Sequence, residues 1–232
     1  MVQPRSALII GASRGLGWGL AREFTRQDWS VIATVRDTHR RTALHSLQAE
    51  SGGALEIERV DITKPDEIAA LRARLLGRRF DLLFVAAGVT NDTTQTIGEV
   101  ATDEFVRVMV TNALSPLRVI EQFLDLVTPV GQVAVMSSEL GSVTDNTDGG
   151  WEVYRASKAS LNTLMRCLVA RRTADTRTYY VIAPGWVRTD MGGPSAPLDI
   201  DTSVRGVIYA MRARVGTRGL VFVDYRNELL PW

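Results

Sequence analysis

Cysteine and long apolar runs are scarce in this sequence, and their scarcity narrows the classes of protein to which it can belong. The only cysteine among the 232 residues is Cys167, so no disulfide can form within the chain, a usage that fits a reducing compartment. No apolar run reaches the ~18 residues of a membrane-spanning helix. Residues 1–5 lead directly into a short apolar run and lack the pattern of a signal peptide. These features predict a cytoplasmic protein with no membrane partner.

An excess of one charge sign is also missing. The chain has 27 basic and 26 acidic residues and a formal net charge of +1, so no strong field attracts nucleic acid. A hydrophobic content of 45% and a charged content of 23% are close to the average of globular chains and exclude disordered and collagen-like architectures. The length favours one domain, spanning residues 1–232.

Lysine is rare although basic residues are not. Lys64 and Lys158 are the only lysines, and the other 25 of the 27 basic residues are arginines. The two side chains are not interchangeable, because lysine carries a compact ammonium and arginine a planar fork. A lysine that persists in such a chain indicates a position where the ammonium is needed.

Short apolar runs alternate with longer amphipathic stretches along the whole chain. The runs predict strands at residues 6–10, 31–35, 55–60, 81–87, 132–136, 178–183 and 220–223. The stretches predict helices at residues 16–27, 42–50, 65–76, 102–127, 151–172 and 202–215. Within the fourth of these helices, Pro116 predicts a kink or a break.

This alternation predicts the fold class. Strands joined by helices form right-handed crossovers and a parallel sheet, and continuously apolar strands are typical of a sheet covered on both faces. We therefore predict a single doubly wound Rossmann-type α/β domain with a seven-stranded parallel sheet and helices on both faces. Such sheets bind ligands beyond the carboxyl ends of their strands, so the residues that follow each strand are the candidate site residues.

A glycine-rich turn follows the first predicted strand, with the spacing G-x-x-x-G-x-G. Glycine permits a tight turn and lets a pyrophosphate approach the N-terminus of the next helix, where free N–H groups favour anions. The alternative is a glycine-rich turn without a ligand. No P-loop motif is present, which disfavours a P-loop nucleotidase. The turn predicts a cofactor-binding loop formed by Gly11, Ser13, Arg14, Gly15, Leu16 and Gly17.

The second predicted strand ends at Val35, followed by Arg36 and Asp37. Folds that select NAD usually place an acid at this strand end, whereas an arginine suits the 2′-phosphate of NADP. Arg36 therefore favours NADP(H), with Arg14 as a possible second phosphate contact. Arg36 could instead be one of many surface arginines, and the adjacent Asp37 keeps NAD(H) open.

Two further strand ends carry candidate cofactor contacts. Asp61 could accept a hydrogen bond from the adenine amino group while Ile62 lines its ring, although Asp61 could instead be the N-cap of the next helix. After the fourth strand, Ala87 and Gly88 are small enough to let the backbone pass close to a cofactor.

The most specific chemistry lies after the fifth predicted strand. Tyr154 and Lys158 are spaced i, i+4 and share one face of a helix, and a strand ending in serine precedes them. A phenol with a pKa near ~10 is a poor acid at neutral pH, but a neighbouring ammonium and a cationic nicotinamide favour the phenolate. The pair is therefore a candidate for general acid–base catalysis.

Taken in order, these residues resemble the short-chain dehydrogenase/reductase family over the whole chain. The resemblance is carried by the glycine-rich loop, Asp61, Asn112, Ser138, Tyr154, Lys158 and the segment 184–189. The segments 137–142, 146–150, 154–158 and 185–193 are similar to the carbonyl-reductase branch that includes C-factor and sniffer. One departure is Ala86, because the family usually has asparagine there, and this puts loop packing and cofactor affinity in doubt.

The resemblance implies roles for individual residues. Tyr154 would be the general acid, Lys158 would lower its pKa and bind the nicotinamide ribose, and Ser138 would hold the substrate oxygen. Asn112 would support a proton relay to Lys158, although it could also be a satisfied polar residue of its helix. The nicotinamide would be bracketed by Pro184, Gly185, Val187 and Thr189.

These observations predict an NADP(H)-dependent oxidoreductase that reduces a small aldehyde or ketone. The loop 192–200 is a plausible lid, and Met191, Trp151 and Trp186 are candidate walls, unless the tryptophans simply pack in the core. The alternative is a dinucleotide-binding regulator with little turnover; a methyltransferase would not explain Ser138, Tyr154 and Lys158 together. By analogy with relatives, we expect a homodimer or homotetramer formed through helices 102–127 and 151–172. We expect no metal.

Overall fold

The computed structural model describes residues 4–37 and 40–232. The prediction that no signal peptide is present concerns residues 1–5 and therefore lies partly outside the described residues. Within them, no helix is both long and apolar enough to cross a membrane.

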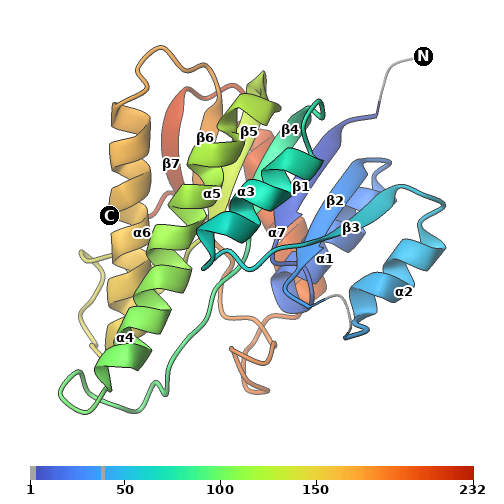
Figure 1. The fold of residues 1–232 in the computed structure, drawn as a ribbon. Coiled ribbons are helices and arrows are strands. Elements are labelled where there is room, and N and C mark those ends of the chain that lie inside the picture. The colour runs from blue at the N-terminus through green and yellow to red at the C-terminus, as the bar shows by residue number, and fades with distance from the viewer. Residues whose placement is uncertain (1–3, 38–39) are drawn as a thin grey trace.

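Seven parallel strands form one sheet in the order β3-β2-β1-β4-β5-β6-β7 (Figure 1). Their bounds are β1 Ser6–Ile10, β2 Ser30–Val35, β3 Leu55–Arg59, β4 Phe80–Val85, β5 Val127–Met136, β6 Thr178–Ala183 and β7 Gly219–Asp224. Most strand residues are buried, as expected for continuously apolar runs covered on both faces. The predicted fold class is confirmed.

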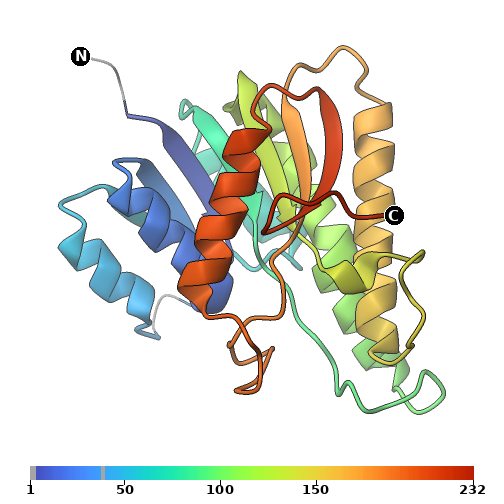
Figure 2. The same ribbon diagram turned by 180° about the vertical axis from the view of Figure 1, so that it is seen from behind.

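Helices cover the two faces of the sheet. They are α1 Gly15–Arg26, α2 Ala43–Glu50, α3 Pro65–Arg74, α4 Thr102–Met109, α5 Ser115–Phe123, α6 Glu152–Ala170 and α7 Ile200–Ala213. Figure 1 shows α3, α5 and α6 in front of the sheet, and Figure 2 shows α1, α2 and α7 in front of the opposite face.

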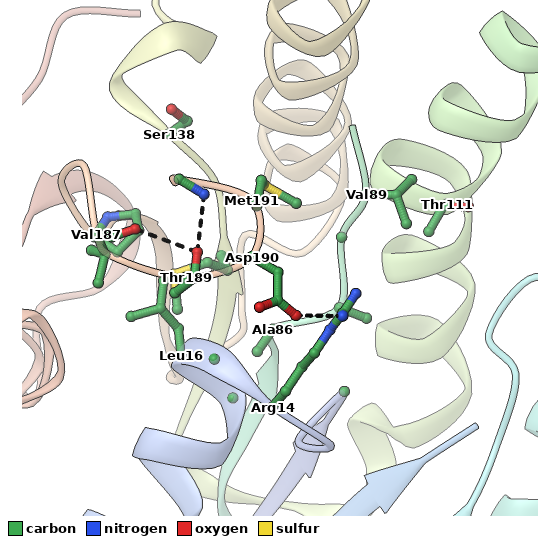
Figure 3. A pocket seen from close by; sticks show the side chains of 18 of the residues that line it. Arg14, Leu16, Ala86, Val89, Thr111, Ser138, Val187, Thr189, Asp190 and Met191 are labelled. Carbon is green, nitrogen blue, oxygen red and sulfur yellow. Dashed lines mark hydrogen bonds and ion pairs between the residues drawn. The ribbon is translucent and has the colours of Figure 1, made fainter. Parts of the chain in front are cut away.

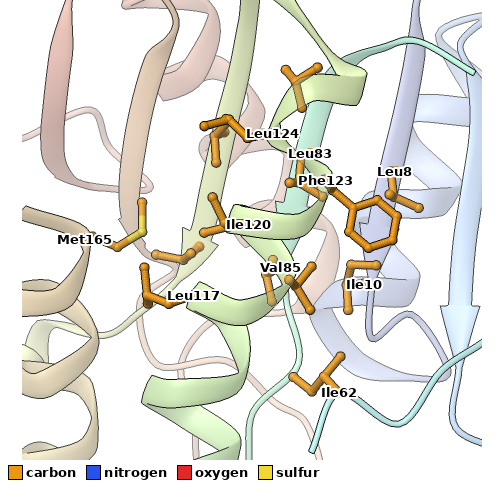
Figure 4. Close-up of a cluster of buried hydrophobic side chains, with 14 of the residues drawn as sticks. Leu8, Ile10, Ile62, Leu83, Val85, Leu117, Ile120, Phe123, Leu124 and Met165 are labelled. Carbon is orange, nitrogen blue, oxygen red and sulfur yellow. The ribbon is translucent and has the colours of Figure 1, made fainter. Parts of the chain in front are cut away.

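Each face has its own hydrophobic core. On one face, Leu117 and Ile120 of α5 and Met165 of α6 pack with the strand residues Leu83 and Val85 (Figure 4). On the other face, α1, α2 and α7 pack against the opposite side chains of the same strands. The sheet is thereby fixed between two layers, and the loops at its carboxyl edge are held on a rigid base.

The predicted helix 102–127 is four consecutive helical segments in the structure. A π-helical turn, Val110–Leu114, separates α4 from α5, and a 3₁₀ turn, Leu124–Leu126, ends the run. Pro116 lies in the first turn of α5, directly after the π turn, and its missing N–H explains why regular α-helical bonding stops there. The predicted interruption is confirmed, but the predicted end is wrong, because Val127 begins β5.

Several other bounds differ from the prediction. β4 ends at Val85, so Ala86 and Ala87 belong to the following loop, and β5 begins at Val127 instead of residue 132. α6 begins at Glu152, and Trp151 is its N-cap in a left-handed backbone conformation. The remaining elements begin and end within about two residues of the predicted positions, the usual scatter of helix ends.

Candidate active site

A cavity of about 890 Å³ opens at the carboxyl ends of the strands (Figure 3). It lies where the strand order reverses between β1 and β4, the usual ligand site of a doubly wound sheet. Of the residues predicted to bind cofactor or substrate, all but Asn112 line it: Gly11, Ser13, Arg14, Gly15, Leu16, Gly17, Arg36, Asp61, Ile62, Ala87, Gly88, Ser138, Tyr154, Lys158, Pro184, Gly185, Val187 and Thr189.

Two glycines, one in the loop after β1 and one in the first turn of α1, are required by close backbone packing. Gly11 has φ +89°, and a Cβ atom there would lie 2.7 Å from the Cβ of Ala87. A Cβ atom on Gly17 would lie 2.1 Å from the carbonyl oxygen of Gly11. The loop is therefore tight, and any larger side chain at either position would disrupt it.

The start of α1 is suited to an anion. Its N-cap, Arg14, makes no side-chain capping hydrogen bond, and no acidic residue occupies the first turn, so the first N–H groups keep their affinity for negative charge. By contrast, the Asp199 carboxylate caps α7 by accepting a hydrogen bond from the N–H of Thr202. The tight glycine-rich loop and the uncapped N-terminus of α1 fit the pyrophosphate of a dinucleotide.

Two basic residues, Arg14 and Arg36, line the same cavity as this helix start. Arg36, at the end of β2, is exposed and lines the cavity, whereas Asp37 does not line it. The Arg14 guanidinium forms an ion pair with the carboxylate of Asp190, from the loop that follows β6, with 2.5 Å between Nη1 and Oδ2. Arg14 therefore lies at the expected place but already has an acidic partner.

Asp61 lies in a tight turn after β3. Its Oδ1 accepts hydrogen bonds from the backbone N–H and the hydroxyl of Thr63, at 2.9 and 2.7 Å. Burial opposes ionisation, but these hydrogen bonds and the charges of Lys64 and Arg36 hold the pKa of Asp61 below its usual value. Lys64, not Asp61, is the N-cap of α3, so the alternative interpretation of Asp61 as an N-cap is wrong.

Ser138, Tyr154 and Lys158 come from two elements and meet on one wall of the cavity. Ser138 is the second residue after β5 and caps a 3₁₀ turn, Glu139–Gly141, through its Oγ atom. Tyr154 and Lys158 lie on the buried face of α6, with the Lys158 ammonium 5.5 Å from the centre of the Tyr154 ring. The Lys158 ammonium also donates a hydrogen bond to the carbonyl oxygen of Met136, at 2.8 Å.

The pKa values of Tyr154 and Lys158 differ from the expectation that Lys158 lowers the pKa of Tyr154. Burial raises the pKa of Tyr154 to about 12, only partly offset by its hydrogen bond with Ser138. Burial also lowers the pKa of Lys158 to about 8. Removal from water disfavours the phenolate and the ammonium alike, so the protein groups alone do not produce the expected lowering of the Tyr154 pKa.

Asn112 does not line the cavity. It lies in the π turn, fully buried, where Nδ2 donates to the carbonyl oxygen of Val89 and to Oγ of Ser157, while Oδ1 accepts from the N–H of Val89. A Cβ atom on Gly88 would lie 3.5 Å from both Asn112 Oδ1 and Lys158 Nζ. Asn112 thus fixes the loop after β4 beside Lys158, which agrees with the alternative of a satisfied polar residue.

The segment after β6 is held by its own hydrogen bonds. The Thr189 hydroxyl donates to the carbonyl oxygen of Val187 and accepts from the N–H of Gly192, at 3.3 and 3.1 Å. Of the predicted lid, residues 192–200, only Gly192 and Ile200 line the cavity. The rest of that loop is tied down instead, for example by Arg188, which donates to the carbonyl oxygens at positions 196 and 197.

The predicted walls Trp151, Trp186 and Met191 do line the cavity. Sequence reasoning missed several polar residues of the lining: Arg107, Thr111, Glu139, Arg188 and Asp190. Arg107 and Thr111 are spaced i, i+4 on the helix that also carries Asn112. That spacing was visible in the sequence, but the hydrogen bonds that hold Asn112 against Val89 were not.

The fold and the site define a Rossmann-type α/β protein with a tyrosine–lysine pair beside a glycine-rich nucleotide loop. A family model described as Enoyl-(Acyl carrier protein) reductase matches residues 11–213. The chain belongs to the short-chain dehydrogenase/reductase family of oxidoreductases.

Relatives of known structure match almost the entire chain. A short-chain dehydrogenase/reductase from Burkholderia multivorans with bound NADP is 51% identical, with a TM-score of 0.97, over 99% of this chain and 100% of that one. A carbonyl reductase from Pseudomonas aeruginosa is 34% identical, with a TM-score of 0.92, over 98% and 100%. C-signal from Myxococcus xanthus is 36% identical over 154 residues, 66% of this chain and 92% of that protein.

Proposed function

We propose that this protein is an NADP(H)-dependent reductase that transfers a hydride to a small aldehyde or ketone. The supporting observation is that Ser138, Tyr154 and Lys158 meet in the same cavity as the glycine-rich loop and the uncapped start of α1. A nucleotide phosphate at the N-terminus of α1 and a substrate carbonyl oxygen at Tyr154 would then lie in the same cavity. The volume of the cavity falls within the range of about 300–1,000 Å³ typical of ligand sites.

In the proposed reaction, Tyr154 donates its phenolic proton to the carbonyl oxygen. Bound NADPH supplies the hydride. Burial raises the pKa of Tyr154, so the phenol is protonated at neutral pH but gives up its proton less readily; the Lys158 ammonium, 5.5 Å from the centre of the ring, opposes this effect by favouring the phenolate that forms. The Ser138 hydroxyl orients the substrate oxygen toward Tyr154.

We infer a preference for NADP(H) over NAD(H). Arg36 lines the cavity at the end of β2, where an arginine suits a 2′-phosphate, and Val35 occupies the place where an acid would favour NAD. Asp37, the residue that would favour NAD(H), does not line the cavity. The bound NADP in the Burkholderia relative and the NADPH in the name of mouse carbonyl reductase [NADPH] 1 support this choice.

Thermal-shift titrations with NADPH and NADH test the proposal. A ligand at ~100 times its dissociation constant stabilises the folded state by about 2.7 kcal/mol. We expect NADPH to raise the melting temperature at a much lower concentration than NADH does, and NADPH to be consumed when small aldehydes and ketones are added. A larger effect of NADH would indicate that Asp37 binds the adenosine ribose. If neither nucleotide changed the melting temperature, the dehydrogenase assignment would be refuted.

The similarity to C-signal supports a second candidate, a dinucleotide-binding regulator with little turnover. It predicts the same NADPH-induced shift but no consumption of NADPH with any carbonyl compound. The two readouts, taken together, distinguish the candidates.

We also propose that copies of the chain associate through the helices α4 and α6. α4 exposes Val106, whose accessible fraction is 48%, and α4 lies beside α6 on the same side of the molecule (Figure 1). Light scattering should give the mass of a dimer or tetramer for the wild type and a smaller mass for Val106→Glu. A monomeric wild type would refute this proposal.

A further inference from the structure

Trp151 adopts a backbone conformation that is unusual for its type. Its φ is +52°, and it follows Gly149 and Gly150, both with φ +66°, in a run of three left-handed residues. The other non-glycine residues with positive φ in the described part of the chain are Asp28 and Asn227, which belong to the types that tolerate this conformation. A bulky aromatic residue there is strained, and such strain persists only where the surroundings fix it, commonly at functional sites.

The strained backbone places the indole ring against the candidate general acid. The rings of Trp151 and Tyr154 are 5.7 Å apart between centroids, with an interplanar angle of 71°, an edge-to-face arrangement. Trp151 is half-buried, lines the cavity and belongs to neither hydrophobic core of the described residues. Its main packing partner is therefore the candidate site itself.

A second indole lines the same cavity and is held in place. Trp186 is 55% exposed, an unusually open position for tryptophan, yet its Nε1–H donates a hydrogen bond to the carbonyl oxygen of Gly192, at 2.8 Å. Gly192 is closely packed, because a Cβ atom there would lie only 2.1 Å from the carbonyl oxygen of Val187. The two indoles, Met191 and Leu140 all contribute apolar surface to the lining of the cavity.

We propose that Trp151 is a specificity-determining residue and that the protein selects carbonyl compounds whose carbonyl carbon bears a flat aromatic ring. The inference rests on the proposed function for the position of the carbonyl at Tyr154. A ring attached to that carbon lies within reach of the Trp151 indole, where a flat π-system gains stacking or edge-to-face contact that a puckered saturated ring does not gain.

Benzaldehyde and cyclohexanecarbaldehyde form a matched pair for the test, because each has a six-membered ring on the formyl carbon and only one is flat. The measured quantity is the ratio of kcat/KM for the two aldehydes with saturating NADPH. We expect the wild type to have the higher kcat/KM for benzaldehyde. Trp151→Leu should reduce the ratio of kcat/KM for benzaldehyde to that for cyclohexanecarbaldehyde by about threefold to tenfold, the size of an aromatic contact. Trp151→Phe should retain most of it, and Trp232→Leu, which removes a tryptophan that packs on Phe222 outside the cavity, should leave it unchanged.

A third substitution of Trp151 separates selectivity from folding. Trp151→Gly removes both the ring and the left-handed strain. Its kcat/KM ratio for the two aldehydes should therefore fall as it does in Trp151→Leu, but its melting temperature should be higher than that of Trp151→Leu. The NADPH-induced thermal shift should be the same in all variants. An unchanged ratio in both Trp151→Leu and Trp151→Gly would overturn the inference.

Binding of the product alcohols keeps this inference separate from the proposed function. Calorimetry with benzyl alcohol and cyclohexylmethanol, with and without NADP⁺, should give tighter binding of the aromatic alcohol to the wild type and a smaller difference in Trp151→Leu. If the wild type reduces neither aldehyde, the proposed function is wrong. In that case the dissociation constants of benzyl alcohol and cyclohexylmethanol still test whether the site prefers a flat ring. Equal or inverted affinities in the wild type would overturn it.

Discussion

The Arg14 guanidinium and the Asp190 carboxylate join two of the loops that line the cavity, the glycine-rich loop before α1 and the loop after β6 (Figure 3). Both side chains are 72% exposed, so the pair contributes little to stability. Its consequence is electrostatic, because Asp190 neutralises an arginine that is expected to contact a cofactor phosphate. A phosphate at Arg14 would compete with Asp190.

Removing this competitor should tighten cofactor binding. In Asp190→Asn, Arg14 keeps its position but loses its anionic partner, and we expect the dissociation constant of NADPH to fall by up to about fivefold, the scale of an exposed ion pair. Titration calorimetry at low salt would measure it. Arg14→Gln should weaken NADPH binding, and adding Asp190→Asn to Arg14→Gln should then have no effect. Equal tightening in the presence and absence of Arg14 would contradict this explanation.

The pH dependence of reduction should reflect Lys158. Its pKa of about 8 means that the ammonium is present below that pH and lost as the pH rises through it. Without the ammonium, the phenolate that Tyr154 becomes is less favoured, so kcat/KM for reduction should fall above pH ~8. In Lys158→Arg, whose guanidinium stays protonated, the residual rate should not fall in this range. A wild-type profile that stays flat to pH ~9.5 would contradict the assignment.

How much of this site the sequence could predict depends on whether local or tertiary interactions decide each feature. The loop of Gly11 and Gly17 could be predicted, because spacing and steric demand are local properties. The joint position of Tyr154 and Lys158 could also be predicted, since a helix brings residues four apart onto one face.

Other features depend on tertiary packing and could not be predicted. Asn112 and Thr111 are adjacent, yet only Thr111 lines the cavity, and Asn112 instead makes hydrogen bonds with the backbone of Val89 in the loop after β4. The raised pKa of Tyr154 comes from burial by neighbouring elements, which no spacing reveals. The left-handed backbone of Trp151 contradicts the preference of its residue type, so sequence reasoning placed it inside α6.

Tyr154→Phe should separate turnover from cofactor binding. The variant keeps the ring that contacts Trp151 but removes the proton donor, and general acid catalysis typically contributes about 10²–10⁴-fold. We expect kcat for carbonyl reduction to fall by that factor while the NADPH-induced thermal shift stays within experimental error. A variant with near wild-type kcat would exclude Tyr154 as the acid.

Two buried serines should respond in opposite ways to replacement by alanine. Ser137, directly before Ser138, donates a hydrogen bond of 2.7 Å to Oδ1 of Asn162, whose Nδ2 donates to the carbonyl oxygen of Gly141. Ser137→Ala leaves a buried acceptor of Asn162 without this donor, and we expect it to lower the free energy of unfolding by about 1–3 kcal/mol.

Ser115 is the matched control, because it is equally buried but its hydroxyl has no hydrogen-bond partner among the described residues. Ser115→Ala removes an unsatisfied polar group and places a better helix former in α5, so the free energy of unfolding should stay unchanged or rise by up to ~1 kcal/mol. Urea denaturation of both variants measures the contrast. Because Asn162 lies on the helix that carries Tyr154 and Lys158, Ser137→Ala should also lower kcat through displacement of Ser138, whereas Ser115→Ala should not. If both variants were destabilised equally, loss of buried volume alone would explain the result, and the Ser137–Asn162 hydrogen bond would have no special role in holding Ser138.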